Sequence, residues 1–305
     1  MSVTESQKTW NVGELLTWST RYLSEKEIDS PRLNVEWLLS HTLRCKRIDL
    51  YTNYDRPLNQ AELTEFKSML LRRIAHEPLQ YIVGTAEFMG LTFEVNTDVL
   101  IPRPDTELLV EKTIELCLNN IGATVRILEI GTGSGNISIS IAFYLEKKGI
   151  PHTITALDIS EKALILARRN SERVSGSENI NFVFGNIFDE TTMAFPLHSF
   201  DVIVSNPPYV SDEEFMLLPK EVKDHEPVIA LKADENGFAF YNYITKNAKS
   251  FFSSNLTKKH VIFEVGYNQA EKVKQCLAEH GFEVKIFKDL GHINRVVCGS
   301  LNEQN

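Results

Sequence analysis

Apolar side chains follow a helical spacing in the first part of the chain and a strand-like pattern in the rest. Residues 12–76 repeat apolar groups on one face of each segment, as at Leu15, Leu16 and Leu23, which predicts a small helical bundle. Residues 79–101 are rich in β-forming side chains around two glycines and predict a short hairpin. The pattern therefore divides the chain into a helical domain, a hairpin linker and a larger domain, at residues 1–78, 79–103 and 104–305.

Beyond the hairpin, short apolar runs alternate with helical segments. Such alternation is typical of an α/β fold, in which parallel strands form one sheet with helices on its faces. The last two strands are close in sequence and favour an antiparallel pair. We therefore expect a mostly parallel seven-stranded sheet with one antiparallel edge strand. The predicted strands are residues 125–130, 152–157, 180–184, 200–204, 260–265, 282–287 and 293–298.

Composition narrows the class of protein. The 305 residues are 43% hydrophobic, which is ample for a core, and carry 41 acidic against 32 basic side chains, a formal charge of −9. This acidic balance argues against nucleic acid as the main substrate, although a local basic patch would still be compatible with it. No apolar run approaches a membrane span and residues 1–8 lack a signal-like apolar stretch, so we expect a cytoplasmic protein. Neither a disulfide framework nor a metal site is indicated by the scattered cysteines Cys45, Cys117, Cys276 and Cys298.

A glycine loop follows the first predicted strand of the larger domain. Residues 131–136 read Gly-Thr-Gly-Ser-Gly-Asn and lead into an apolar helix. Glycines allow positive φ and a close approach of a ligand to the backbone. A dinucleotide fingerprint would need a glycine where Asn136 stands, so the pattern weakens that interpretation. A tight strand-to-helix turn without a ligand is the alternative.

Polar residues also end the next two strands. Asp158 follows residues 152–157, and a carboxylate at that point can accept the hydroxyls of a ribose. A helix cap is the alternative role for Asp158, although Ser160 is the better placed N-cap. Asn186 and Ile187 follow the third strand, where the amide can hydrogen-bond an adenine edge while the apolar side chain packs on its face.

The turn after residues 200–204 has the chemistry to hold an amide or amino nitrogen. It reads Asn206, Pro207, Pro208, Tyr209, and the prolines keep the backbone out of the helical region. The side-chain oxygen of Asn206 and the backbone oxygen of Pro207 then present two acceptors, which match the two donors of a planar NH2 group. Tyr209 adds a flat face. An ordinary strand-to-loop turn is the alternative interpretation.

These four strand ends occur in the chain order that is found in class I S-adenosylmethionine-dependent methyltransferases, which the chain resembles. Residues 77–84 with Phe88, and residues 101–107, are similar to the signatures of the protein-(glutamine-N5) methyltransferases that act on peptide chain release factors. The resemblance implies a Rossmann-like sheet, S-adenosylmethionine as methyl donor and class 1 release factors as substrate, in support of translation termination. A separate helical bundle beside a methyltransferase core favours recognition of the substrate by the helical domain, and a purely structural packing role is the alternative.

The resemblance assigns roles to individual residues. The loop Gly131, Thr132, Gly133, Ser134 and Gly135 would surround the methionine and ribose of the donor, Asp158 would hold the ribose, and Asn186 with Ile187 would frame the adenine. Asn206, Pro207, Pro208 and Tyr209 would bind the glutamine; Asn206, Pro207 and Tyr209 would be catalytic, and Asn206 would also contact the donor. The family usually has an acidic residue at 186 and a bulky aromatic at 187, so weaker adenine stacking is expected here. Arg103 and Glu107 would line the entrance, and a helix start at residues 104–107 is the alternative. The charged insertion at residues 211–230 would border the active site or be solvated.

Alternative activities remain at this point. An N6-adenine or RNA-base methyltransferase would use the same Asn-Pro-Pro-Tyr turn on a flipped base. A methyltransferase for another protein or a small molecule, and a catalytically silent scaffold on the same fold, are further possibilities. The favoured interpretation expects release factors as partners, no direct nucleic acid, no membrane and a monomer.

Overall fold

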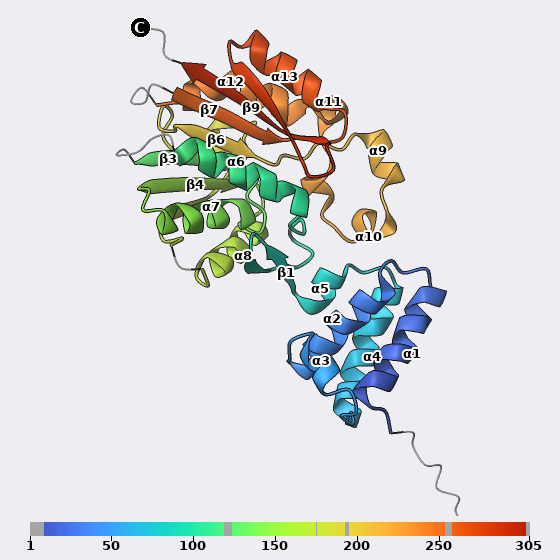
Figure 1. Cartoon of the computed structure of the whole chain (residues 1–305). Coiled ribbons are helices and arrows are strands. Elements are labelled where there is room, and N and C mark those ends of the chain that lie inside the picture. The colour runs from blue at the N-terminus through green and yellow to red at the C-terminus, as the bar shows by residue number, and fades with distance from the viewer. Residues whose placement is uncertain (1–8, 119–123, 175, 193–194, 254–257, 303–305) are drawn as a thin grey trace, which may run out of the picture. The chain divides into compact units, whose positions relative to one another are not determined.

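The structure, a computed structural model, describes residues 9–118, 124–174, 176–192, 195–253 and 258–302 (Figure 1). The chain forms two compact units. One comprises residues up to Gly84 together with Lys220–His225, and the other comprises Thr85–Pro219 and Glu226 onward. The predicted boundary at residue 78 is therefore displaced, and the hairpin belongs to the second unit instead of forming a separate linker.

The first unit is a helical bundle, as predicted. Two of its helices begin with reciprocal caps: Asn11 accepts a hydrogen bond from the Glu14 backbone, whose carboxylate bonds back, and Asn59 and Glu62 do the same. The apolar faces meet in one core that includes Leu38, and burial of these faces stabilises the bundle. The helices are α1 (Val12–Glu25), α2 (Pro31–Leu43), α3 (Asp49–Thr52), α4 (Gln60–Ile74) and α5 (Leu79–Val83).

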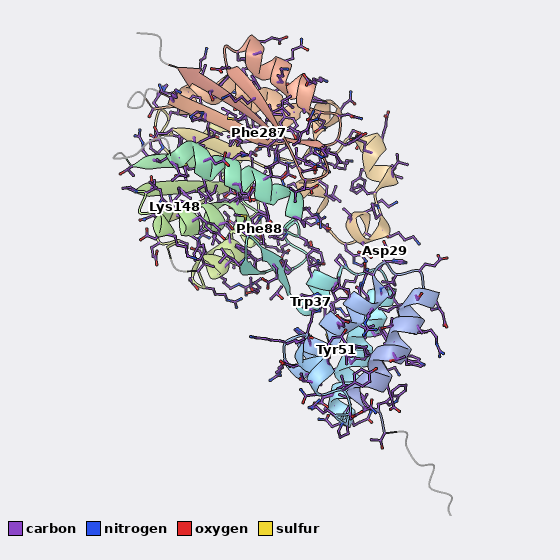
Figure 2. All side chains as sticks on the ribbon, viewed as in Figure 1. Asp29, Trp37, Tyr51, Phe88, Lys148 and Phe287 are labelled. Carbon is purple, nitrogen blue, oxygen red and sulfur yellow. The ribbon has the colours of Figure 1, made fainter. Side chains whose placement is uncertain are left out.

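The prediction of a hairpin from residue 79 was wrong over its first part, because Leu79–Val83 is the short helix α5. A five-residue apolar run does not distinguish a helix from a strand by its period. Gly84, at φ 77°, ends the helix in a left-handed conformation that suits glycine. The hairpin proper is β1 (Thr85–Phe88) and β2 (Leu91–Glu94), where Phe88, labelled in Figure 2, packs edge-on against Phe93.

The helix α10 (Lys220–Lys223) belongs to the helical unit although it lies far along the chain. Arg73 of α4 is only 3% exposed and forms an ion pair with Glu221 of α10. The same guanidinium donates to Asn34 Oδ1 at 2.6 Å and to the Glu77 backbone oxygen at 3.0 Å. A buried charge needs such partners, so a segment of the insertion completes the first unit.

The second unit contains the predicted seven-stranded sheet, in the order β5-β4-β3-β6-β7-β9-β8. The strands are β3 (Val125–Ile130), β4 (His152–Asp158), β5 (Ile180–Phe184), β6 (Val202–Ser205), β7 (Lys258–Glu264), β8 (Glu283–Lys288) and β9 (Asn294–Asn302). Pairing is parallel from β5 to β7, whereas β9 runs antiparallel to both β7 and β8.

The antiparallel strand is thus not at the edge, which corrects the sequence-based expectation. Val296, Val297 and Cys298 of β9 are buried, as suits a strand with neighbours on both sides, and β9 pairs with β7 from Lys258 to Glu264. The residues of β8 are exposed or half-buried, as suits an edge strand.

Helices cover both faces of the sheet, and successive strand residues point to opposite faces (Figure 1). Leu128 and Ile203 pack with helices α12 and α13 on one face, whereas Ile127, Val202 and Val204 pack with α6 and α7 on the other. This arrangement gives a three-layer α/β unit with all parallel strand ends at one edge. Its helices are α6 (Glu107–Leu118), α7 (Asn136–Lys147), α8 (Glu161–Ser171), α9 (Asp212–Leu217), α11 (Asp234–Gly237), α12 (Ala239–Phe251) and α13 (Ala270–Glu279), with 3-10 turns η1 (Pro104–Thr106), η2 (Glu190–Thr192) and η3 (Val228–Ala230).

Candidate active site

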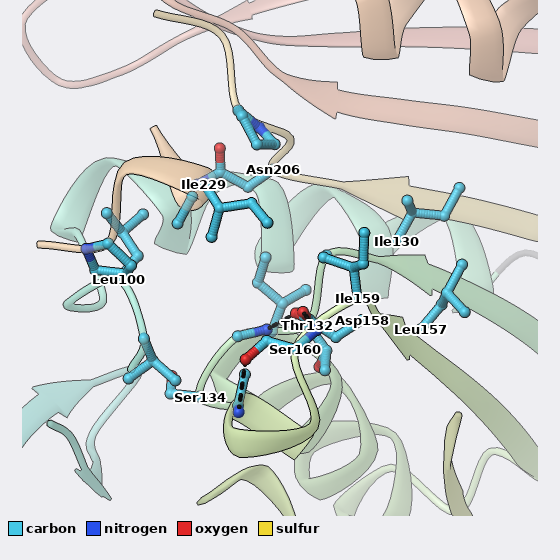
Figure 3. A pocket seen from close by; sticks show the side chains of 18 of the residues that line it. Leu100, Ile130, Thr132, Ser134, Leu157, Asp158, Ile159, Ser160, Asn206 and Ile229 are labelled. Carbon is cyan, nitrogen blue, oxygen red and sulfur yellow. Dashed lines mark hydrogen bonds between the residues drawn. The ribbon is translucent and has the colours of Figure 1, made fainter. Parts of the chain in front are cut away.

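The carboxyl ends of the parallel strands open into one pocket of about 250 Å³. Asn206 and Ile229 lie across the pocket from Asp158 and Thr132 (Figure 3). The pocket brings together most of the predicted site residues: Gly131, Thr132, Gly133, Ser134, Asp158, Asn186, Ile187, Asn206 and Pro208. Gly135, Pro207 and Tyr209 are not among its lining residues.

The glycine loop after β3 requires its glycines for backbone reasons. Gly131 and Gly133 have φ values of 81° and 53°, which L side chains rarely adopt. A Cβ on Gly133 would meet no atom within 4 Å, so the backbone borders open space that a ligand can fill. Gly135 has a different role, because a Cβ there would lie 2.8 Å from the Ile139 side chain and 3.2 Å from Ala167.

Asp158 ties the loop to the end of β4. Its carboxylate accepts the Gly133 backbone N–H at 2.8 Å and the Ser160 N–H at 2.9 Å. Burial raises the pKa of Asp158, and these N–H donors act in the opposite direction. The helix cap of α8 is Ser160, which accepts the Ala163 N–H at 3.2 Å as predicted. The carboxylate is therefore a pocket group and not the helix cap.

The loop after β5 provides an aromatic face that the sequence analysis missed. Asn186 Oδ1 accepts the Phe188 backbone N–H at 3.0 Å, and Ile187 is only 4% exposed. Phe188 lines the pocket, is 41% exposed and packs against Phe240 with ring centroids 4.8 Å apart. The aromatic ring that the family usually has at residue 187 is thus provided here by Phe188. The available sequence signal was a phenylalanine beside Asp189 in the loop that follows a predicted strand.

Two loops form another wall of the pocket. Leu100 and Arg103 line it from the segment before α6, and Ile229 lines it from η3. Arg103 forms an ion pair with Glu226, whose carboxylate also accepts the Ile101 N–H at 3.3 Å. Because the Glu226 side chain is 1% exposed, this pair fixes the insertion against the earlier loop.

Arg103 therefore lines the pocket, as expected, whereas Glu107 does not. The Glu107 carboxylate accepts the Met89 backbone N–H at 2.7 Å, and Glu107 begins α6. Of the charged insertion, Pro227, Ile229 and Ala230 line the pocket.

Asn206 is anchored by a residue that the sequence analysis did not single out. Its Nδ2 donates to Thr106 Oγ1 at 3.2 Å, and Thr106 is 2% exposed. Among the described residues no hydrogen bond occupies Asn206 Oδ1. Tyr209 is half-buried, and its backbone oxygen accepts from Gln269 Nε2 at 2.9 Å. Burial raises the pKa of Tyr209 to about 12, so its phenol stays neutral at physiological pH.

Two buried carboxyl groups lie on β3 and β7, which are separated by β6 in the sheet. Glu129 of β3 accepts from Thr132 Oγ1 at 2.7 Å, and Glu264 ends β7. Burial raises the pKa of each to about 7. One oxygen of each, Glu129 Oε1 and Glu264 Oε2, has no hydrogen-bond partner in the described structure.

The described residues contain no group of three or more His, Cys, Asp or Glu side chains with the geometry to hold a metal ion. Similarly, none of the helices in the described ranges combines the length and apolar character that are needed to cross a membrane.

The sheet order, the glycine loop and the carboxylate after the second strand define a class I S-adenosylmethionine-dependent methyltransferase. Residues 14–84 match the family model described as the PrmC N-terminal domain, and residues 121–286 match a methyltransferase domain. A release factor glutamine methyltransferase from Geobacter sulfurreducens is 37% identical over 303 residues, covering 98% of this chain and 100% of the relative. Another, from Chlorobaculum tepidum, is 38% identical over 293 residues, covering 95% and 97%. The chain belongs to the release factor glutamine methyltransferase family.

A solved structure with the same fold is the hMettl16 catalytic domain in complex with MAT2A 3'UTR hairpin 1. Its TM-score is 0.51 at 16% sequence identity, covering 82% of this chain and 85% of that one, which supports the fold alone. The family assignment confirms an enzyme with S-adenosylmethionine as methyl donor and does not favour the adenine or RNA-base alternative. The open glycine backbone and the Asp158 carboxylate in the pocket fit this donor.

Proposed function

We propose that this enzyme transfers the methyl group of S-adenosylmethionine to the side-chain amide nitrogen (N5) of a glutamine, the one in the Gly-Gly-Gln motif of class 1 peptide chain release factors. One observation carries the proposal. Asn206 lines the same pocket as the glycine loop and Asp158, so a polar acceptor for the substrate lies beside the residues that fit the donor. The modification would support translation termination.

The target nitrogen sets what the residues must do. Its lone pair is delocalised into the carbonyl, so an amide nitrogen is a poor nucleophile. Bound S-adenosylmethionine supplies an electrophilic methyl group. The protein contributes alignment: Asn206 Oδ1 and the Pro207 backbone oxygen accept the two N–H groups, and their dipoles stabilise the positive charge that develops on nitrogen. The flat faces of Pro208 and Tyr209 restrict the amide plane.

No general base is needed next to the nitrogen, and the turn contains no histidine or lysine. The glycine loop, Asp158, Asn186 and Ile187 hold the donor, and Phe188 adds a face for the adenine ring. In this proposal, the helical unit recognises the release factor, and the enzyme works as a cytoplasmic monomer without direct nucleic-acid contact. The formal charge of −9 supports the last point.

The test is methylation of a purified release factor with S-adenosylmethionine, followed by mass spectrometry of the peptide that contains Gly-Gly-Gln. A release factor in which this glutamine is replaced by glutamate is the substrate control. We expect one added methyl group on the glutamine, and none on the control.

Asn206→Ala tests the acceptor. We expect the variant to fold and to bind the donor, yet to lose about a hundredfold in kcat, because misplacing a reacting atom by about an ångström has that effect. Asn181→Ala, on the exposed side of β5, is the matched control and should keep wild-type turnover. A near wild-type rate for Asn206→Ala would refute the assignment.

A further inference from the structure

Glu264 lies beside the proposed substrate acceptor. Ser205 of β6 pairs with Phe263 of β7 in parallel register, so Asn206 and Glu264 follow as neighbours at the same sheet edge. Glu264 is 3% exposed, and the polar side chains of Thr106 and Asn206 face its carboxyl group. A buried carboxyl group with an unpartnered oxygen is costly, so its position needs a reason beyond packing.

We propose that Glu264 is a positioning residue that, through Thr106 and Asn206, keeps the Asn206 amide oriented with its oxygen toward the substrate. The inference rests on the proposed function, in which that oxygen accepts an N–H of the substrate glutamine.

The oxygen and the NH2 group of asparagine have similar size, so shape alone does not select one orientation. Thr106 bonds Asn206 Nδ2 at 3.2 Å, but a hydroxyl group is both donor and acceptor and would also tolerate the reversed amide. An ionised carboxylate only accepts hydrogen bonds. Glu264 is therefore the group that requires donors from Thr106 and Asn206, which leaves Asn206 Oδ1 free for the substrate.

The surrounding charges make this orientation dependent on pH. Burial, together with the charge of Asp105, raises the pKa of Glu264 to about 7, whereas hydrogen bonds from Thr106 and Asn206 and the charge of Arg295 act in the opposite direction. Tyr209, which also lies near this carboxyl group, is neutral in this range. Arg295 also pairs with Asp105 at 3.0 Å, and the neutral Tyr241 hydroxyl donates to the Glu264 backbone oxygen at 2.9 Å. A protonated Glu264 gains a donor and permits the reversed amide. We therefore expect kcat at saturating substrates to rise with pH through the neutral range.

Glu264→Gln removes the ionisation while keeping the shape. We expect kcat to fall about tenfold to a hundredfold, the cost of a misaligned contact to the reacting group, while the donor Kd stays at the wild-type value. The rise of kcat with pH should also disappear. Thr106→Val should lower kcat in the same way, whereas Thr106→Ser, which keeps the hydroxyl, should restore it.

Glu129→Gln is the matched control, because Glu129 is also buried and burial raises its pKa to about 7 as well. It bonds Thr132 of the glycine loop and does not face Asn206, so its substitution should change the donor Kd and leave the pH dependence of kcat in place.

The inference would be overturned if Glu264→Gln kept the wild-type kcat and an unchanged pH profile. It would also be overturned if a raised donor Kd explained the loss of activity. If Glu264→Gln does not fold, equal kcat for Thr106→Val and Thr106→Ser would overturn it. If Glu264 proves unimportant but the proposed function holds, Asn206→Ala still loses its activity. A fully active Asn206→Ala instead refutes the proposed acceptor itself.

Discussion

Glu129 allows a quantitative test of the electrostatics beneath the glycine loop. The side chain has 0% exposure, and burial raises its pKa to about 7 from the ordinary value of 4.5. The folded state therefore binds the proton more tightly than the unfolded state does. The resulting stability is fully present below pH 4.5 and is lost as pH rises to about 7. At about 1.4 kcal/mol for each pKa unit, this loss amounts to about 3 kcal/mol.

Glu129→Gln cannot ionise, so it escapes this loss. We expect the variant to gain about 3 kcal/mol in unfolding free energy relative to wild type between pH 4.5 and pH 8. The measurement is urea-induced unfolding followed by circular dichroism at the two pH values. Tryptophan fluorescence would report on the wrong unit, because Trp10, Trp18 and Trp37 all lie in the helical unit.

The difference in unfolding free energy between wild type and Glu129→Gln reports on Glu129 alone. Glu264 has the same raised pKa and remains in both proteins, so its contribution cancels from the difference. A difference that is equal at both pH values, or larger in acid, would show that Glu129 does not carry the charge penalty and would refute the reasoning.

Two further predictions concern the donor site. Asp158→Asn replaces one carboxylate oxygen by an NH2 group, which opposes the N–H donor of Gly133 or Ser160. The donor Kd, measured by calorimetry, should rise at least about tenfold. An unchanged Kd would contradict the role of the carboxylate. Ile187→Ala should raise the donor Kd and also lower the unfolding free energy by about 2–4 kcal/mol, since the side chain is 4% exposed. If only stability changes, Ile187 is a core residue and not part of the site.

The sequence was sufficient to place the residues that follow the strands. Parallel strands deliver their carboxyl ends to one edge, so Gly131, Asp158, Asn186 and Asn206 could be brought together from chain order alone. The sequence contained no comparable signal for residues that come into contact only through tertiary packing. The bond from Asn206 to Thr106 spans 100 positions, and the position of Glu264 depends on the register of β6 and β7.

The sequence-based predictions were wrong where the local pattern of apolar residues was ambiguous. The apolar run Leu79–Val83 satisfied the strand pattern but folds as a helix after Pro78. The position of β9 within the sheet was also undetermined, because closeness in sequence fixes an antiparallel partner but not which of the two strands takes the edge.

The contribution of α10 to the helical unit has a practical consequence for dissecting the enzyme. A fragment that stops at Gly84 would contain Arg73 without Glu221, so the guanidinium would keep Asn34 and the Glu77 backbone oxygen but lose its ion-pair partner. Because Glu221 is partly exposed and removal of α10 opens the guanidinium to water, the loss amounts to about 1 kcal/mol. The isolated bundle is therefore better expressed with residues 220–225 grafted on through a linker, or with Arg73 exchanged for an uncharged side chain.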